Sequence, residues 1–335
     1  APRPLLVLQP QAGGNITNFM LKLGAKTPKT PNESTLISNL RLDGNNAIGN
    51  TANAATLMIA EGDGAVVKDT EIFNNKLGPT PYTPAGLYFI CSACKKNEVT
   101  NVVIYNHYYG VIFRAGLTPA LANKISKSTI HDIRCDTVTF AGYGEAAGNK
   151  ISLAGWGCNN GPIPGGGFYS LNNNQGAKIT GNTLFNVCGH GMDIDRVANL
   201  TVENNHIYDP GYTWNGTRNY CGGNAGFFLD VRNSKITSNT FENNHRPRNA
   251  GGTDPNRVFS ASGAGLFSDL PAGSKTVVSF VLAHRSNEPG DSASHNTINR
   301  NAFRANCSAA EGCTGLGYFT SRGSGLINGN WSAQT

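Results

Sequence analysis

Three aspartates fall in two short segments that both have the pattern of a β-strand. Asp193 and Asp195 are two residues apart in Gly191-Met-Asp-Ile-Asp, and Asp230 ends Gly226-Phe-Phe-Leu-Asp. Side chains alternate along a strand, so Asp193 and Asp195 should share one face, with Cα atoms about 6.6 Å apart. We expect Asp230 one coil further along, about 4.8 Å from Asp195. Carboxylates this close require a neighbouring cation or a raised pKa, and both conditions are typical of a catalytic or metal site.

Two kinds of cation are candidates for balancing these acids. Arg114, Arg196 and Arg232 are close enough in the pattern to supply positive charge. Ca²⁺ is the other candidate, because it favours several carboxylate oxygens, and its ligands would be Asp193, Asp195 and Asp230. A purely structural ladder of acids balanced by arginines is the alternative.

His190 stands at the turn that enters the first acidic segment, in Cys188-Gly-His-Gly. A histidine there is expected to protonate near neutrality and to reach the same face as the aspartates. The alternative is that the Gly-His-Gly string serves the turn alone. Trp214, in a long insert over 209–224, is a candidate substrate wall, although loop aromatics also serve packing.

Segments that begin with glycine recur upstream of most repeat units and place other side chains on the same face. In each segment the first and third positions after glycine suit the interior, and the second and fourth should point outward. The outward positions include the candidate substrate-binding residues Tyr88, Arg114, Tyr169 and Phe228. Exposed aromatics beside carboxylates suit a sugar-binding groove. The alternative is that long inserts cover this face.

A short repeat explains how these segments are positioned. In each unit apolar residues flank an asparagine, as in Ile179-Thr-Gly-Asn-Thr-Leu. From the unit that starts at Ile37 to the unit that starts at Ile236, successive units are 30, 32, 26, 26, 28, 23 and 34 residues apart. Such short units cannot bury a face alone and must stack. We therefore predict one parallel β-helix domain over residues 1–335, with about ten coils. The longer step from Ile236 to Ile298 should hide one irregular coil.

Composition supports an all-β protein. Glycine and asparagine contribute 41 residues each, and both are poor helix formers. Charged residues make up only 14%, which argues against disorder. No apolar run approaches the length of a membrane helix, and no basic cluster suggests a nucleic-acid partner. We expect a monomer that binds neither membrane nor nucleic acid.

Eight cysteines and six N-x-S/T sequons favour a secreted, extracellular glycoprotein. We expect cysteines adjacent in the sequence to form disulfides: Cys91–Cys94, Cys135–Cys158, Cys188–Cys221 and Cys307–Cys313. The sequons begin at Asn15, Asn32, Asn199, Asn215, Asn306 and Asn330.

The repeat resembles the right-handed β-helix of the pectin-lyase-like superfamily. Within it, Met192-Asp-Ile-Asp-Arg and Phe228-Leu-Asp-Val-Arg are similar to a pectate lyase motif, and Asn239-Thr-Phe-Glu-Asn-Asn-His-Arg-Pro-Arg to a second one. The resemblance implies that Asp193 or Asp195 with Asp230 holds Ca²⁺. It also implies that Arg246 or Arg248 is the base, with Arg232 in place of the family's lysine.

Gly189-His190-Gly191 also resembles a string of polygalacturonase-type glycoside hydrolases. The aspartate motifs of that family are absent from the chain, which excludes a close match but not a more distant hydrolase.

Three functions follow from these observations. The first is a lyase that cleaves a uronate-containing polysaccharide by β-elimination, which needs a cation against the uronate and a base for the α proton. His190 is a candidate base beside the arginines, since a free arginine is a poor one. The second is a glycoside hydrolase or transglycosidase using two of the three aspartates. The third is a β-helix that binds glycans without catalysis.

Overall fold

The computed structural model of the chain describes residues 3–7, 19–23, 32–33, 35–45, 54–59, 62–75, 84–90, 95–114, 118–155, 166–171, 175–187, 190–208, 224–244, 276–283, 294–306, 314–321 and 324–328. Within them the regular structure is almost all strand, with one turn of 3₁₀ helix over Pro119–Leu121.

Three parallel sheets of ten strands each make up the fold. The first sheet contains β1 (Leu5–Val7), β5 (Arg41–Asp43), β9 (Glu71–Asn75), β12 (Val103–His107), β15 (Thr129–Ile133), β18 (Lys150–Ala154), β21 (Thr183–Val187), β24 (His206–Tyr208), β27 (Thr240–Asn244) and β30 (Ala302–Asn306). The second contains β2 (Phe19–Leu23), β6 (Ala55–Ile59), β10 (Ala85–Phe89), β13 (Tyr109–Phe113), β16 (Val138–Phe140), β19 (Phe168–Leu171), β22 (Met192–Asp195), β25 (Gly226–Leu229), β28 (Thr276–Ala283) and β31 (Thr314–Ser321). The third contains β4 (Leu36–Ser38), β8 (Val66–Lys68), β11 (Glu98–Thr100), β14 (Asn123–Ser126), β17 (Gly144–Ala147), β20 (Lys178–Thr180), β23 (Thr201–Glu203), β26 (Lys235–Thr237), β29 (Ser294–Asn299) and β32 (Ser324–Asn328). A small pair, β3 (Asn32–Glu33) with β7 (Gly62–Asp63), lies outside the three sheets.

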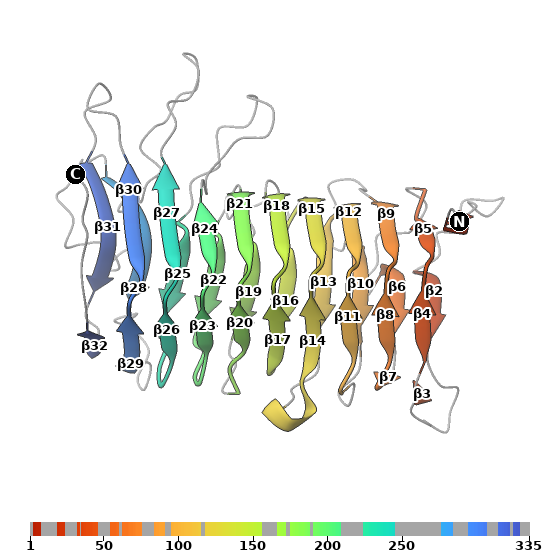
Figure 1. The fold of residues 1–335 in the computed structure, drawn as a ribbon, viewed down its shortest axis with the longest axis horizontal. Coiled ribbons are helices and arrows are strands. Elements are labelled where there is room, and N and C mark those ends of the chain that lie inside the picture. Colours follow the sequence, from red (N-terminus) through yellow and green to blue (C-terminus); the bar gives the residue numbers. More distant parts are fainter. Residues whose placement is uncertain are drawn as a thin grey trace, which may run out of the picture.

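The chain visits the sheets in a fixed order: third, first, second, and then third again. In Figure 1 the coils advance from right to left, the third and first sheets lie in front below and above, and the second lies behind them. Followed from the N-terminal end, the coil turns clockwise as it recedes, so the helix is right-handed, as parallel crossovers almost always are. The fold is therefore the right-handed parallel β-helix that the resemblance to the pectin-lyase-like superfamily implies.

Apolar side chains of equivalent strands stack inside the coil. In the first sheet the inward column is formed by Leu42, Ile72, Ile104, Ile130, Ile151, Leu184, Ile207, Phe241 and Phe303. Each of these residues is buried and belongs to one continuous core. One repeat cannot bury its apolar face, and the neighbouring coil completes the burial.

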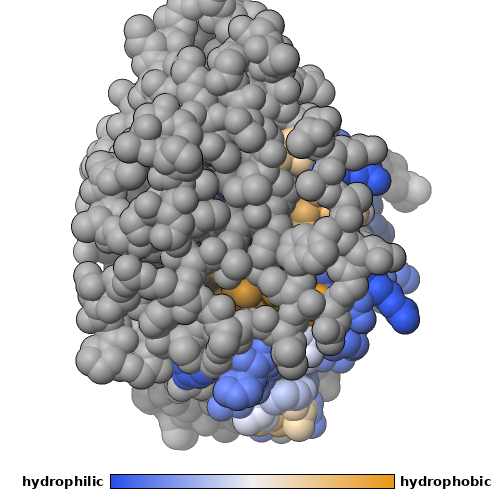
Figure 2. Space-filling view, turned by 90° about the vertical axis from the view of Figure 1, so that its left-hand side faces the viewer, coloured by the Kyte–Doolittle hydropathy of each residue, from blue (hydrophilic) through white to orange (hydrophobic). Residues whose placement is uncertain are grey.

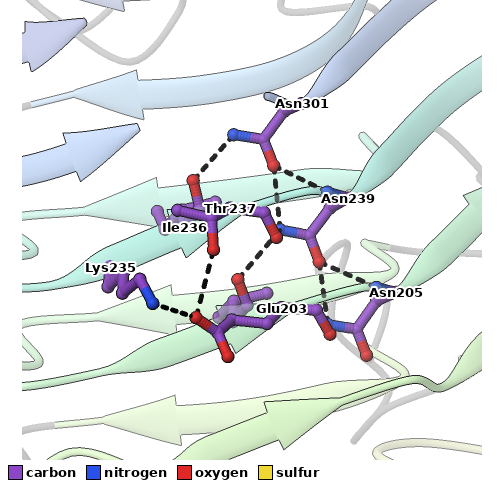
Figure 3. Close-up of polar contacts among 8 residues, drawn as sticks. Glu203, Asn205, Lys235, Ile236, Thr237, Asn239 and Asn301 are labelled. Atoms are coloured by element: carbon purple, nitrogen blue, oxygen red, sulfur yellow. Dashed lines mark hydrogen bonds and ion pairs between the residues drawn. The ribbon is translucent and has the colours of Figure 1, made fainter. Parts of the chain in front are cut away.

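The repeated asparagine forms a buried ladder at the turn between the third and first sheets. Asn205 Nδ2 donates to Asn239 Oδ1 at 2.9 Å, and Asn239 Nδ2 donates to Asn301 Oδ1 at 2.9 Å (Figure 3). The same bonds continue toward the N-terminus through Asn182 and Asn149. Each amide therefore satisfies polar groups of the coil beside it.

One sequence-based expectation about the coils is wrong. Ile236 pairs directly with Ile298 in the contact of β26 with β29, so these residues are one coil apart. The long step between them therefore reflects a longer connection within one coil and hides no additional coil.

Figure 2 looks along the axis from the end at which β31 and β32 lie. The described residues along the lower right of this view are mostly hydrophilic, and hydrophobic ones show nearer the middle. Among the described residues, no helix is long and apolar enough to cross a membrane.

Candidate functional site

The predicted working face is the outer surface of the second sheet. Strand pairing places Thr139, Tyr169, Asp193 and Phe227 in register on β16, β19, β22 and β25. All four are partly exposed, whereas their neighbours along each strand are buried. The alternation expected for Tyr169 and Asp193 is therefore confirmed.

Glycines at the entry to this sheet allow the coils to approach closely. A Cβ on Gly167 would lie 2.5 Å from the carbonyl oxygen of Gly191, and a Cβ on Gly191 would lie 2.6 Å from that of Ala225. Real Cβ atoms do not approach that closely, so glycine is required at both positions. This requirement explains the glycine at the start of the outward segments of β19 and β22.

The predicted register is wrong by one residue in β25. Gly226 pairs with Met192, and Ala225 takes the place that glycine occupies in the preceding coils. Phe228 therefore points inward, is fully buried and belongs to the core, so its prediction as an exposed substrate-binding residue is wrong. Phe227 takes the outward position. Ring packing explains the shift, because a Cβ on Gly226 would lie 2.7 Å from the ring of Phe280.

The same shift changes the position of Asp230. Leu229, and not Asp230, lies opposite Asp195. Asp230 comes one residue later, at the corner where the chain leaves the sheet with φ 50°, and its side chain is fully buried. Asp230 is therefore not the neighbour of Asp195 on an open face.

Asp195 is held by the arginine that follows it. Arg196 Nε lies 3.6 Å from Asp195 Oδ1, and Asp195 is 8% exposed. The expectation that Arg196 supplies positive charge to the acidic strand is thus confirmed. Arg232 lies further on, level with Ala198 beyond the second sheet.

A fourth carboxyl group, which the sequence pattern did not reveal, belongs to this face. Backbone bonds from Thr137 to Gly166 and from Gly167 to His190 align Asp136, Gly166 and His190 in one row along the axis. The Gly166 amide donates to Asp136 Oδ1 at 2.8 Å. Burial of the carboxyl raises the pKa of Asp136 to about 6, although part of the residue stays accessible. In this coil Thr137 stands where β19 and β22 have their entry glycine. The search for segments that begin with glycine therefore did not find this strand or the adjacent Asp136.

Tyr169 lies among the carboxylates. Burial of the phenol, and after it the charges of Asp136, Asp193 and Asp195, raise the pKa of Tyr169 to about 12, while Arg196 opposes them. These groups therefore surround one hydroxyl, which stays protonated over the whole physiological range. Gly166 lies close against the next coil, since a Cβ at this position would lie 3.2 Å from the carbonyl oxygen of His190 and 3.4 Å from Asp193 Cβ.

His190 differs from its prediction in its charge. Burial lowers its pKa to about 4, so the ring is neutral near pH 7 and does not titrate near neutrality. The backbone amide of Asn224 donates to Nδ1 at 3.1 Å, which leaves the proton on Nε2. The ring stacks on Phe227 with a centroid distance of 4.3 Å. His190 therefore presents a hydrogen-bond donor and no free base.

Two predicted substrate residues lie on this face but toward the N-terminal end. Tyr88 is only 2% exposed and packs with Ala55, Met58 and Ala85. The exposed Arg114 lies over its ring, with Cζ 5.5 Å from the centroid. Tyr88 is thus a packed side chain and not an open platform. Trp214, Arg246 and Arg248 lie outside the described residues.

The carboxylates do not form the predicted calcium site. Among the residues that the structure describes, no group of three or more histidines, cysteines, aspartates or glutamates is arranged to hold a metal ion. This result includes Asp193, Asp195 and Asp230, and the register explains it, because Asp230 lies at the corner and Asp195 pairs with Arg196. These residues therefore do not fit Ca²⁺.

Cys135 directly precedes Asp136 and is disulfide-bonded. Its partner and the other cysteines lie outside the described residues, so the pairing with Cys158 stays a prediction.

No protein-family model and no curated protein matches the sequence. Two solved structures are similar in backbone course. One is the Dettilon tailspike protein gp208, with a TM-score of 0.42 and 15% identity over 96% of this chain and 60% of that one. The other is a mutant of DFA-IIIase from Arthrobacter chlorophenolicus A6 in complex with DFA-III, with a TM-score of 0.44 and 14% identity over 94% of this chain and 75% of that one. The chain thus spans less than two thirds of the tailspike protein.

Proposed function

We propose that the chain is a secreted glycoside hydrolase that acts on a polysaccharide at the outer face of the second sheet. The observation that carries this proposal is the group of carboxyls around the Tyr169 hydroxyl, in which Asp136 differs in pKa from an ordinary aspartate. Glycoside hydrolysis needs two carboxyl groups in different protonation states, one as acid and one as base.

Asp136 is suited to the role of general acid. With a pKa of about 6, a substantial fraction of this carboxyl keeps its proton in mildly acidic solution. Gly166 holds one carboxyl oxygen, which leaves the other oxygen to protonate the departing glycosidic oxygen. The partly accessible surface of the residue permits contact with a substrate.

Asp193 is suited to the role of general base. It comes from a different coil than Asp136, and both acids lie at Gly166: the Gly166 amide donates to Asp136 Oδ1 at 2.8 Å, and a Cβ on Gly166 would lie 3.4 Å from Asp193 Cβ. Inverting hydrolases place their carboxyls about 6.5–9.5 Å apart, with a water molecule between. In the proposed reaction Asp193 takes a proton from that water, the oxygen attacks the anomeric carbon, and Asp136 gives its proton to the leaving oxygen.

The remaining polar groups suit the binding of a sugar. Tyr169, with its pKa of about 12, stays a neutral hydroxyl that can donate a hydrogen bond between the two acids. His190 offers Nε2–H at the end of the row. Phe227 stacks on His190 and extends the apolar surface on which a sugar ring can lie.

The competing prediction, β-elimination on a uronate, needs a cation against the substrate carboxylate. The described residues do not form a metal site, and Arg196 is paired with Asp195. The base that the resemblance assigns to Arg246 or Arg248 lies outside the described residues. Hydrolysis therefore fits the described part of the site better.

The reaction class is tested by incubating the protein with a panel of neutral and uronate polysaccharides. New reducing ends and absorbance near 235 nm are recorded together. Hydrolysis predicts reducing ends without absorbance. Unsaturated absorbance would establish β-elimination instead, and the absence of both signals over the panel would favour a β-helix that binds glycans without cleaving them.

A further inference from the structure

A row of aromatic rings lies on the outer face of the first sheet. Phe73 stacks on Tyr105 at 5.2 Å between centroids and 11° between planes, and Tyr105 stacks on His131 at 5.0 Å and 3°. Further along the axis, Phe185 stacks on Tyr208 at 5.4 Å and 8°. These five residues are the ring row, in which each ring lies nearly parallel to the next.

The ring row is interrupted at one coil. Strand pairing places Ser152 between His131 and Phe185. Two strand spacings put the two rings about 9.6 Å apart, which leaves room for one further ring between them. Ser152 is 8% exposed and forms the floor of this slot.

A positive charge lies over the Phe185 wall of the slot. Lys150 lies on the same strand as Ser152, and its Nζ is 5.4 Å from the centroid of Phe185. Among the described ion pairs none involves Lys150, whereas Lys124 and Lys235 each have a glutamate partner. Thr129 and Thr183 lie level with Lys150 on the neighbouring strands of the same face and add hydroxyl groups.

We propose that this slot binds one sugar ring of an anionic polysaccharide between His131 and Phe185. A saturated ring stacks well on aromatic faces, and the hydroxyls of Ser152, Thr129 and Thr183 suit a polyhydroxylated ligand. The ammonium of Lys150 pairs with the carboxylate of a uronate. The slot lies on a different sheet from Asp136 and Asp193, so it anchors the polymer and takes no part in bond cleavage.

The experiment is affinity electrophoresis of the Asp136→Asn variant in gels containing polygalacturonate, alginate or dextran. This background prevents cleavage, so the result does not depend on the proposed hydrolysis. We expect retardation by polygalacturonate or alginate and little by neutral dextran. Ser152→Phe places a ring in the slot and should weaken retardation about tenfold, while the matched Ser152→Ala keeps the slot open and should retain it.

Two further measurements make the result unambiguous. Ser152→Phe should not lower the melting temperature, because the new ring continues the stack, so loss of binding would not reflect unfolding. Lys150→Ala should reduce retardation in the anionic gels alone. Equal retardation of the Ser152→Phe and Ser152→Ala proteins would overturn the proposal, as would no retardation in either anionic gel or retardation by dextran that equals that of the anionic polymers.

Discussion

Asp193 lies directly opposite Tyr169 where β22 pairs with β19, and its carboxylate contributes to the raised pKa of the Tyr169 phenol. The charges of Asp136 and Asp195 also raise the pKa of the same phenol. Acids that come from separate coils therefore meet at one tyrosine. Such convergence of titratable groups on an exposed sheet face is the pattern expected of a catalytic site.

Replacing Asp193 with asparagine tests the base. The variant keeps the shape of the side chain but cannot accept a proton from water, so turnover on a cleaved polysaccharide should fall by about 10²–10⁴. Asp69→Asn, on the third-sheet side of the coil, is the matched control and should keep wild-type turnover. Proton NMR of the first product should show inversion at the anomeric carbon. Retention of configuration would contradict the assignment of Asp193 as base.

The raised pKa of Asp136 predicts how stability depends on pH. The folded-state pKa of about 6 exceeds the ordinary value of 3.8, so between these values the folded protein binds more protons than the unfolded chain. Stability from this group is therefore present at low pH and lost as the pH rises toward 6.

Asp136→Asn removes that loss. The melting temperature of the variant minus that of the wild type should therefore increase as the pH rises from 4 to 6. Calorimetry of both proteins across this range measures the difference. The difference between the two proteins also removes the opposite contribution of His190 and His107, which both share. These histidines have pKa values of about 4 in the folded protein, below their ordinary value of 6.5, so both reduce stability as the pH falls below 6.5. A constant difference in melting temperature would show that Asp136 titrates normally.

Two adjacent phenylalanines test the register of β25. Phe228 is fully buried against Phe241 and Phe280, so Phe228→Ala should destabilise the protein by about 3–5 kcal/mol. Phe227 is partly exposed, and Phe227→Ala should cost clearly less. Chemical denaturation of the two variants distinguishes them, and the reverse order of costs would restore the register expected from the glycine pattern.

The buried asparagine ladder should contribute strongly to stability. Asn205 donates to Ile179, Glu203 and Asn239, and its oxygen accepts from Asn182. Asn205→Ala leaves several buried groups without partners, each worth about 1–3 kcal/mol, and should lower the denaturation midpoint strongly. Lys178→Ala, at the exposed first position of β20 in the third sheet, should change stability by no more than about 0.5 kcal/mol. Similar midpoints for both variants would contradict the ladder's role.

The regular part of the fold was predictable because each coil repeats the same local rule. An apolar residue at a fixed place stacks on its equivalent, as Ile179 does on Val202, and asparagine at the turn bonds to the next asparagine. These rules act between adjacent coils and therefore appear as a spacing in the sequence. The glycines at positions 167 and 191 follow from the same close approach of the coils.

The site was less predictable because its properties depend on contacts between unlike coils. Gly226 makes room for the ring of Phe280 and is not an entry glycine. Because the sequence pattern treats it as one, it predicts the wrong positions for Phe228 and Asp230. Asp136 escaped notice because its coil enters the sheet with a threonine. Burial also decides the charge of His190, and no local pattern of residues reports the burial of a ring.

The most direct test of the proposed mechanism is the pH dependence of kcat/KM for the wild type and for Asp136→Asn on a polysaccharide that the protein cleaves. A general acid with a pKa of about 6 predicts that the wild-type activity falls as the pH rises through that value. The variant should lose activity by about 10²–10⁴ and should lack this descending limb. Near-normal activity of Asp136→Asn, or an unchanged descending limb in its profile, would contradict the assignment of Asp136 as the proton donor.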